Sequence, residues 1–185
     1  MKTEIVARSP LLEAEFFERA DTLWEQFERT LSAKDEIGGL LRQVSSPGTY
    51  TFLLATADQV FTRDLVLAFL NRLRAWGKEK LGARHASTPQ IHVYASGCRR
   101  ELVPDATRAR WHYLYSLTRS EPPAVRFLGE DEKTRFGIAL GRISCLQLPF
   151  NQLVAHETHL AYALNGPKRE KKPLEGTILL HGYLW

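Results

Sequence analysis

The sequence predicts an α+β domain in which helices come first and short strands follow. Two apolar stripes at helical spacing lie in the first half, and short apolar segments separated by Pro, Gly, Asn and charged turns lie in the second. Strands at this spacing, following helices, are typical of a sheet that curls into a barrel or a sandwich. We expect one domain over residues 1–185: a mainly helical buttress with one early strand over 1–87, and a β-barrel core over 88–185.

The first helix is predicted to begin near Ser9, which can cap it, with Pro10 in the first turn, where the missing N–H of proline costs nothing. Its apolar residues recur at steps of three and four, and the glycines at 38 and 39 end the pattern. The stripe consists of Leu12, Phe16, Ala20, Leu23, Trp24, Phe27 and Leu31.

A short aromatic-rich segment at 50–55 predicts the early strand, and a second helix follows from Thr62. Thr62 is a natural N-cap, and Asp64 in the first turn suits the helix dipole. Gly77 marks the expected end of this helix. The buried stripe of this second helix consists of Val66, Phe69, Leu70, Leu73 and Trp76. The apolar stripes of both helices are expected to pack on a sheet.

The remaining strands are expected in the second half, where turn residues separate short apolar segments. The charged run at 168–172, between two prolines, is expected to be an exposed loop. His112 and His181 each lie inside a predicted strand, and we expect both to be structural residues. The predicted strands are 91–94, 111–117, 124–128, 136–140, 151–155 and 177–184.

Composition is that of an ordinary folded protein, with 44% hydrophobic and 25% charged residues. The net charge of +4 is mild, and no segment concentrates arginine with exposed aromatics, so nucleic-acid binding is not expected. No apolar run is long enough to span a membrane, and residues 1–10 lack the apolar stretch of a signal peptide, which predicts a cytoplasmic protein. Cys98 and Cys145 are expected to be free thiols.

Several segments of the second half resemble the iron- and 2-oxoglutarate-dependent oxygenases, in their prolyl-hydroxylase-like branch. The resemblance begins with Tyr94-Ala95-Ser96-Gly97, continues through Glu101-Leu102-Val103-Pro104-Asp105 and the strand at 111–118, and returns at 151–155 and 177–184. It spans about half of the chain. It implies a double-stranded β-helix, a jelly-roll or cupin-like barrel, buttressed by the N-terminal helices.

The chemistry of that family does not carry over residue by residue. Its iron is held by two histidines and one carboxylate, and a basic residue pairs with 2-oxoglutarate. In this sequence the aspartate position is Asp105, but the first histidine position is Val103, the distal histidine position falls at Tyr162, and the basic position falls at Thr177. The resemblance therefore implies a degenerate member, with neither iron nor 2-oxoglutarate as cofactor.

A rearranged metal centre is the alternative, built from Asp105 with His156 or His159. On a strand, side chains three residues apart point to opposite faces, so the two histidines would converge only at a turn or bulge. This alternative predicts an active hydroxylase that uses iron and 2-oxoglutarate. A metal-free reaction in the barrel, such as a cyclisation or an isomerisation, is a third option.

The favoured interpretation is a non-catalytic binding module or companion subunit in a modification or biosynthetic pathway. Its partner would be a peptide, a metabolite or another small molecule, or an active enzyme. Arginines around the segment that resembles the metal motif favour an acidic partner, and aromatic residues at the mouth of a barrel can bind a ligand. Trp185 could pack internally or form a homodimer contact. The expected ligand contacts are Arg99, Val103, Asp105, Arg108, Trp111, Tyr113, Tyr162 and Thr177.

Overall fold

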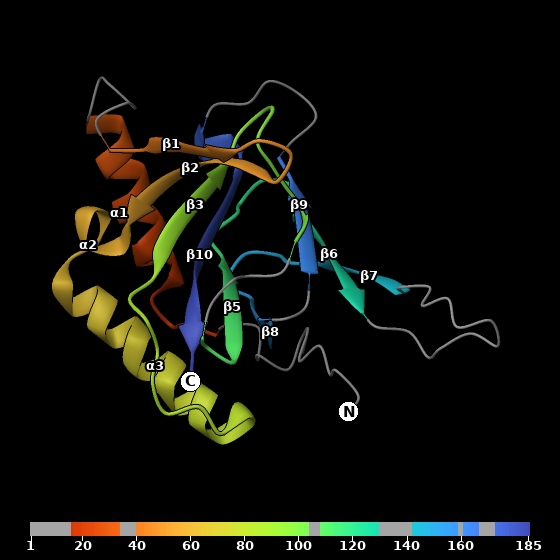
Figure 1. Ribbon diagram of the computed structural model, residues 1–185. Coiled ribbons are helices and arrows are strands. Elements are labelled where there is room, and N and C mark those ends of the chain that lie inside the picture. The colour runs from red at the N-terminus through yellow and green to blue at the C-terminus, as the bar shows by residue number, and fades with distance from the viewer. Residues whose placement is uncertain (1–15, 34–39, 104–107, 130–141, 159–160, 167–172) are drawn as a thin grey trace, which may run out of the picture.

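A computed structural model describes residues 16–33, 40–103, 108–129, 142–158, 161–166 and 173–185 (Figure 1). The helices are α1 (Ala20–Ala33), α2 (Ala57–Val60) and α3 (Arg63–Leu81), and a short 3₁₀ turn covers Pro173–Glu175. No helix within these ranges is long and apolar enough to cross a membrane. The strands are β1 (Arg42–Ser46), β2 (Tyr50–Thr56), β3 (Gln90–Tyr94), β4 (Arg99–Val103), β5 (Trp111–Ser116), β6 (Ala124–Gly129), β7 (Arg142–Gln147), β8 (Leu153–Glu157), β9 (Ala161–Asn165) and β10 (Thr177–Leu184).

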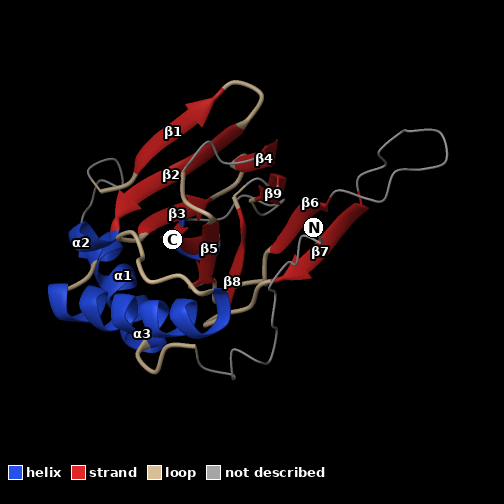
Figure 2. Ribbon diagram, turned by 60° about the horizontal axis from the view of Figure 1, so that its bottom comes forward, coloured by secondary structure: helices blue, strands red, loops and turns tan. Residues whose placement is uncertain are grey.

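The strands form one antiparallel sheet in the order β7-β6-β9-β4-β2-β3-β10-β5-β8, with β1 attached to β2. The sheet curls strongly, so that the β6–β7–β9 part faces the β5–β8 part across an interior (Figures 1 and 2). This curled antiparallel architecture confirms the predicted double-stranded β-helix. β1 and β2 come from the part that we expected to be mainly helical, so the buttress contributes two strands to the sheet.

Helices α1 and α3 cover one face of the curled sheet, which confirms the predicted buttress (Figure 2). Phe69 of α3 is the centre of this contact, because its ring lies 5.0 Å from that of Tyr115 on β5 and 5.5 Å from that of Phe17. Phe16 packs on the ring of Tyr115 at 5.7 Å. The described residues of the two apolar stripes, from Phe16 onward, are therefore buried against the outer face of β5 and its neighbours.

Strand alternation divides the interior of the molecule into two cores. On β5, Tyr113 and Tyr115 face the helices, whereas Leu114 faces the inside of the curled sheet. On β10, Leu180 belongs to the helix-facing core and Leu179 to the interior core. Since successive side chains of a strand point to opposite faces, a strand buried on both sides must be apolar or paired at every position.

Two helix boundaries differ from the prediction. Helix α3 continues past Gly77 to Leu81 and ends at Gly82, whose left-handed backbone (φ 69°) caps it. Gly77 is instead a packing position, because a Cβ there would lie 3.5 Å from the side chain of Leu184. Helix α1 begins at Ala20, and the expected start at Ser9 and Pro10 lies outside the described residues.

The strands expected at 50–55, 91–94, 111–117, 124–128 and 177–184 are confirmed, with small shifts at their ends. The strand expected at 151–155 begins only at Leu153, because Asn151 adopts a left-handed backbone (φ 60°) in the preceding turn. Strands β1, β4, β7 and β9 were not anticipated. The predicted strand at 136–140 and the charged loop at 168–172 fall outside the described residues. Cys98 and Cys145 are free thiols, as expected.

Candidate functional site

Four histidines from four different strands meet inside the curled sheet. We call His92 of β3, His112 of β5, His156 of β8 and His181 of β10 the histidine cluster. His112 and His156 are direct cross-strand partners, with ring centroids 4.9 Å apart. The ring of His181 lies 4.8 Å from that of His112 and 3.8 Å from that of His92. All four residues are buried.

A chain of hydrogen bonds links two of these histidines to the surface. Nε2 of His112 lies 2.6 Å from Nδ1 of His181, and Nε2 of His181 lies 3.2 Å from Oε1 of Gln90, an exposed residue. Because Oε1 of Gln90 can only accept, we assign the proton of His181 to Nε2. Its Nδ1 then accepts from Nε2–H of His112.

Aromatic rings fill the rest of the interior. Phe127 of β6 and Tyr162 of β9 lie 5.1 Å from the ring of His156, and Phe52 of β2 stacks on His92 at 4.0 Å. Nδ1 of His156 donates to the main-chain oxygen of Glu157 at 3.0 Å, which orients its ring toward the others. Phe127 and His156 are 0% exposed and Tyr162 is 1% exposed. The interior is thus packed with the protein's own side chains.

The environment of His181 opposes a positive charge on its ring. Burial, followed by the neighbouring His92, His112, Arg100 and His156, holds the pKa of His181 well below its usual range. Arg100 of β4 is itself buried, and its guanidinium carbon lies 4.1 Å above the ring centroid of Tyr162, within cation–π distance. This permanent positive charge is one of the causes that disfavour protonation of His181.

The structure brings together some of the residues that the sequence singled out. Val103 of β4 is the cross-strand partner of Tyr162, so the two positions that the resemblance gives to the metal histidines are neighbours. The ring of Tyr162 points into the interior, where it contacts His112 and His156. Thr177 is buried at the start of β10, opposite Tyr94. Asp105 and His159 lie outside the described residues.

Other predicted contacts lie elsewhere. Trp111 and Tyr113 belong to the helix-facing core, on the opposite side of β5 from His112. Arg99 and Arg108 are exposed, and Arg99 lies 3.4 Å from Glu101. Trp185 is 52% exposed and stacks on His85.

At the described positions that the resemblance gives to the donors, the side chains do not fit iron and 2-oxoglutarate. Valine at 103 has no lone pair for a metal, and the hydroxyl of Thr177 cannot neutralise a carboxylate. Arg100 places a positive charge over Tyr162, the position that the resemblance gives to the distal histidine, and this charge opposes a cation there. Within the part of the chain that the structure describes, no group of three His, Cys, Asp or Glu side chains could hold a metal ion.

The sequence did not indicate the histidine cluster. Its members come from distant strands, and His112 and His181 were expected to be separate structural residues. One signal was available, because residues two apart on a strand point to the same face. His92, His112 and His181 each lie two residues from a residue of the interior core. These neighbours are Tyr94, Leu114 and Leu179. Only the register of the sheet places the four rings at the same level.

No family model matches the sequence, and a search of curated proteins finds no relative. Solved structures do match. A prolyl-4-hydroxylase from Pseudomonas putida has a TM-score of 0.61 at 14% identity, over 92% of this chain and 89% of that one. The epimerase SnoN from nogalamycin biosynthesis, described as non-heme and alpha-ketoglutarate-dependent, has a TM-score of 0.61 at 12% identity, over 92% of this chain and 74% of that one. HygX from Streptomyces hygroscopicus, with nickel and 2-oxoglutarate bound, has a TM-score of 0.56 at 12% identity, over 90% of this chain and 78% of that one.

Proposed function

We propose that this chain, which has the fold of the iron- and 2-oxoglutarate-dependent oxygenases, is a non-catalytic form of that fold. It acts as a binding module or companion subunit for a peptide, a metabolite or an active enzyme in a modification or biosynthetic pathway. Its described residues supply the barrel and the helical buttress, but not the donor set that the fold uses for iron and 2-oxoglutarate.

The observation that carries this proposal is the packed interior. Phe127, His156 and Tyr162 are buried and in ring contact, and the histidine cluster adjoins them. A substrate and 2-oxoglutarate together need a cavity of several hundred cubic ångströms with access to solvent. Among the described residues, rings in contact at these distances leave no such space between them. Opening one would expose apolar surface and break the His112–His181 hydrogen bond.

The partner surface in this proposal is the rim of the barrel, where the chain presents cations. The side chains of Arg99 and Arg110 are 58% and 66% exposed, and Arg108 is also exposed. Arg110 has its guanidinium carbon 5.3 Å from the ring centroid of Trp111 and lies 3.4 Å from Glu157. Guanidinium groups bind carboxylates in a bidentate manner, so a partner with acidic side chains suits this rim.

Metal and 2-oxoglutarate binding tests the proposal. The tag-free protein is loaded anaerobically with ferrous iron and titrated with 2-oxoglutarate by calorimetry, and succinate release in air is measured. We expect no stoichiometric iron, no saturable heat and no succinate above the level without protein.

Two variants make the outcome decisive. Asp105→Ala removes the remaining carboxylate of the family motif, and Asp58→Ala removes an exposed carboxylate from α2 as the matched control. Stoichiometric iron that is lost only in Asp105→Ala, together with succinate release, would overturn the proposal. That result would establish a rearranged centre in which His156 and His159 are the next residues to replace.

A further inference from the structure

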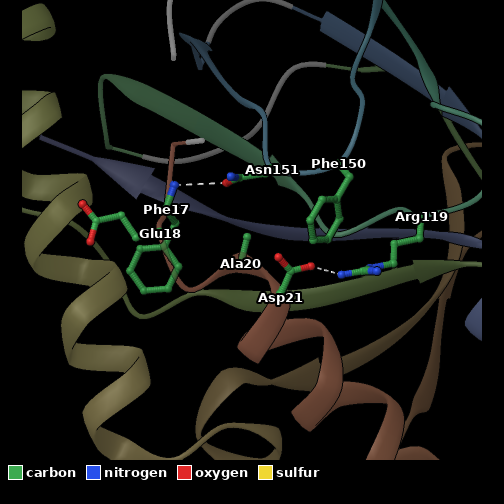
Figure 3. A pocket seen from close by; sticks show the side chains of 7 residues that line it. All are labelled: Phe17, Glu18, Ala20, Asp21, Arg119, Phe150 and Asn151. Carbon is green, nitrogen blue, oxygen red and sulfur yellow. Dashed lines mark hydrogen bonds and ion pairs between the residues drawn. The ribbon is translucent and has the colours of Figure 1, made fainter. Parts of the chain in front are cut away.

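A hollow of about 440 Å³ lies outside the barrel, where the chain enters α1 (Figure 3). It is bounded by the start of α1 and by the turns that follow β5 and precede β8. Its volume falls within the range of small-molecule sites. The lining residues are Phe17, Glu18, Ala20, Asp21, Arg119, Phe150 and Asn151.

Asn151 presents a fixed donor to this hollow. Its Oδ1 accepts two hydrogen bonds, from the main-chain N–H of Phe17 at 3.0 Å and from the hydroxyl of Tyr115 at 2.8 Å. A main-chain N–H can only donate, so the oxygen of the amide must be the atom on that side. The Nδ2 group then points the other way, and it has no acceptor among the described residues. The residue is nevertheless only 4% exposed.

A cation, Arg119, lies at one end of the hollow. Arg119 forms an ion pair with Asp21, and its guanidinium carbon lies 4.6 Å from the ring centroid of Phe150 and 5.6 Å from that of Trp24. A guanidinium has five N–H donors, and the bond to Asp21 uses one of them. Glu18 lies at the opposite end, beyond Phe17 (Figure 3).

We propose that this hollow binds a small zwitterion of the dipeptide class. The ligand's carboxylate accepts hydrogen bonds from Nδ2 of Asn151 and from Arg119, and its ammonium group lies toward Glu18. Its carbon atoms pack on the rings of Phe17 and Phe150. A simple anion would meet the carboxylates of Glu18 and Asp21, and a simple cation would leave the Asn151 donor unused, so a ligand with both charges fits best.

This proposal does not depend on the barrel, and its test is separate from the iron experiment. The probe is glycyl-L-leucine, titrated into the full-length protein by calorimetry. Two blocked compounds are titrated in parallel: N-acetylglycyl-L-leucine, which lacks the ammonium group, and glycyl-L-leucinamide, which lacks the carboxylate. We expect saturable binding of the free dipeptide and at least about tenfold weaker binding of each blocked compound, because each loses a charge-assisted hydrogen bond.

Asn151→Asp is the decisive variant. Aspartate has the same shape, keeps an oxygen for the Phe17 N–H and the Tyr115 hydroxyl, and tolerates the left-handed backbone, but it replaces the Nδ2 donor with an acceptor. Asn165→Asp on β9 makes the same chemical change at an exposed position and is the control. We expect Asn151→Asp to melt cooperatively and to bind the dipeptide at least about tenfold more weakly, with Asn165→Asp unchanged.

Three outcomes contradict the proposal. They are no saturable heat with the wild-type protein up to about 10 mM dipeptide, equal affinity for the free and the blocked compounds, and undiminished binding by a folded Asn151→Asp variant.

Discussion

Acidification should weaken this fold through the histidine cluster. His181 has a folded-state pKa held well below the usual value of about 6.5, so the native state binds fewer protons than the unfolded state in mild acid. Stability from this residue is therefore fully present above about pH 6.5 and is lost as the pH falls below it. At about pH 5 the unfolded state gains roughly 2 kcal/mol from protonating this one imidazole.

Urea unfolding, followed by tryptophan fluorescence at about pH 7.5 and about pH 5, measures this loss. Carboxylates also titrate in this range, so the contribution of His181 must be isolated with a variant. His181→Gln cannot take up the proton and should be less stable than the wild type near pH 7.5, because the hydrogen bond from His112 is altered. Its further loss of stability on acidification should be smaller than that of the wild type by roughly 2 kcal/mol.

Leu180→Ala is the matched control, because Leu180 is buried next to His181 on the other face of β10 and does not titrate. It should lose about 2–5 kcal/mol at both pH values through the cavity it creates. Its dependence on pH should equal that of the wild type. The reasoning is refuted if His181→Gln and the wild type lose the same stability between the two pH values, since His181 would then be protonated equally in both states.

Two further predictions concern packing. Gly166→Ala should destabilise the fold by about 1–3 kcal/mol in urea unfolding, because a Cβ would lie only 2.2 Å from the main-chain oxygen of Ala95. Gly77→Ala is the control, because a Cβ at this helical position would meet its neighbours at ordinary distances. This variant should be as stable as the wild type or up to about 1 kcal/mol more stable. An equal loss of stability in both variants would contradict the argument. Tyr115→Phe should cost about 1 kcal/mol in the same assay, because it removes the hydroxyl that donates to Asn151; unchanged stability would show that this bond contributes nothing.

Local patterns predicted most of the scaffold. Short apolar segments bounded by turn residues located β3, β5, β6 and β10, and helical spacing located the buried face of α3. Glycine was the least reliable signal, because Gly77 and Gly82 both suit a helix end and only Gly82 serves as one. β4 and β7 are rich in charged and polar residues such as Arg99, Glu101 and Arg142, so their sequences lack the apolar run by which a strand is recognised.

The site was harder to predict than the scaffold, because it depends on register between distant strands. A sequence shows His112 and His156 as isolated imidazoles, and only the pairing of β5 with β8 makes them neighbours. Val103 and Tyr162, which the resemblance places at the two histidine positions, are cross-strand partners on β4 and β9, and this pairing was not predicted. Asn151 gave no functional signal, since asparagine in a turn before a strand is common for conformational reasons alone.

The position of β10 determines the order in which the fold can be completed during synthesis. This strand lies between β3 and β5, and residues that bond across it, such as Gln90 and His181, are 91 positions apart in the chain. At about 5–20 residues per second, β3 leaves the ribosome roughly 5 to 20 seconds before its partner exists. During that interval the edge of β3 that will pair with β10 has unpaired main-chain groups and is open to other chains.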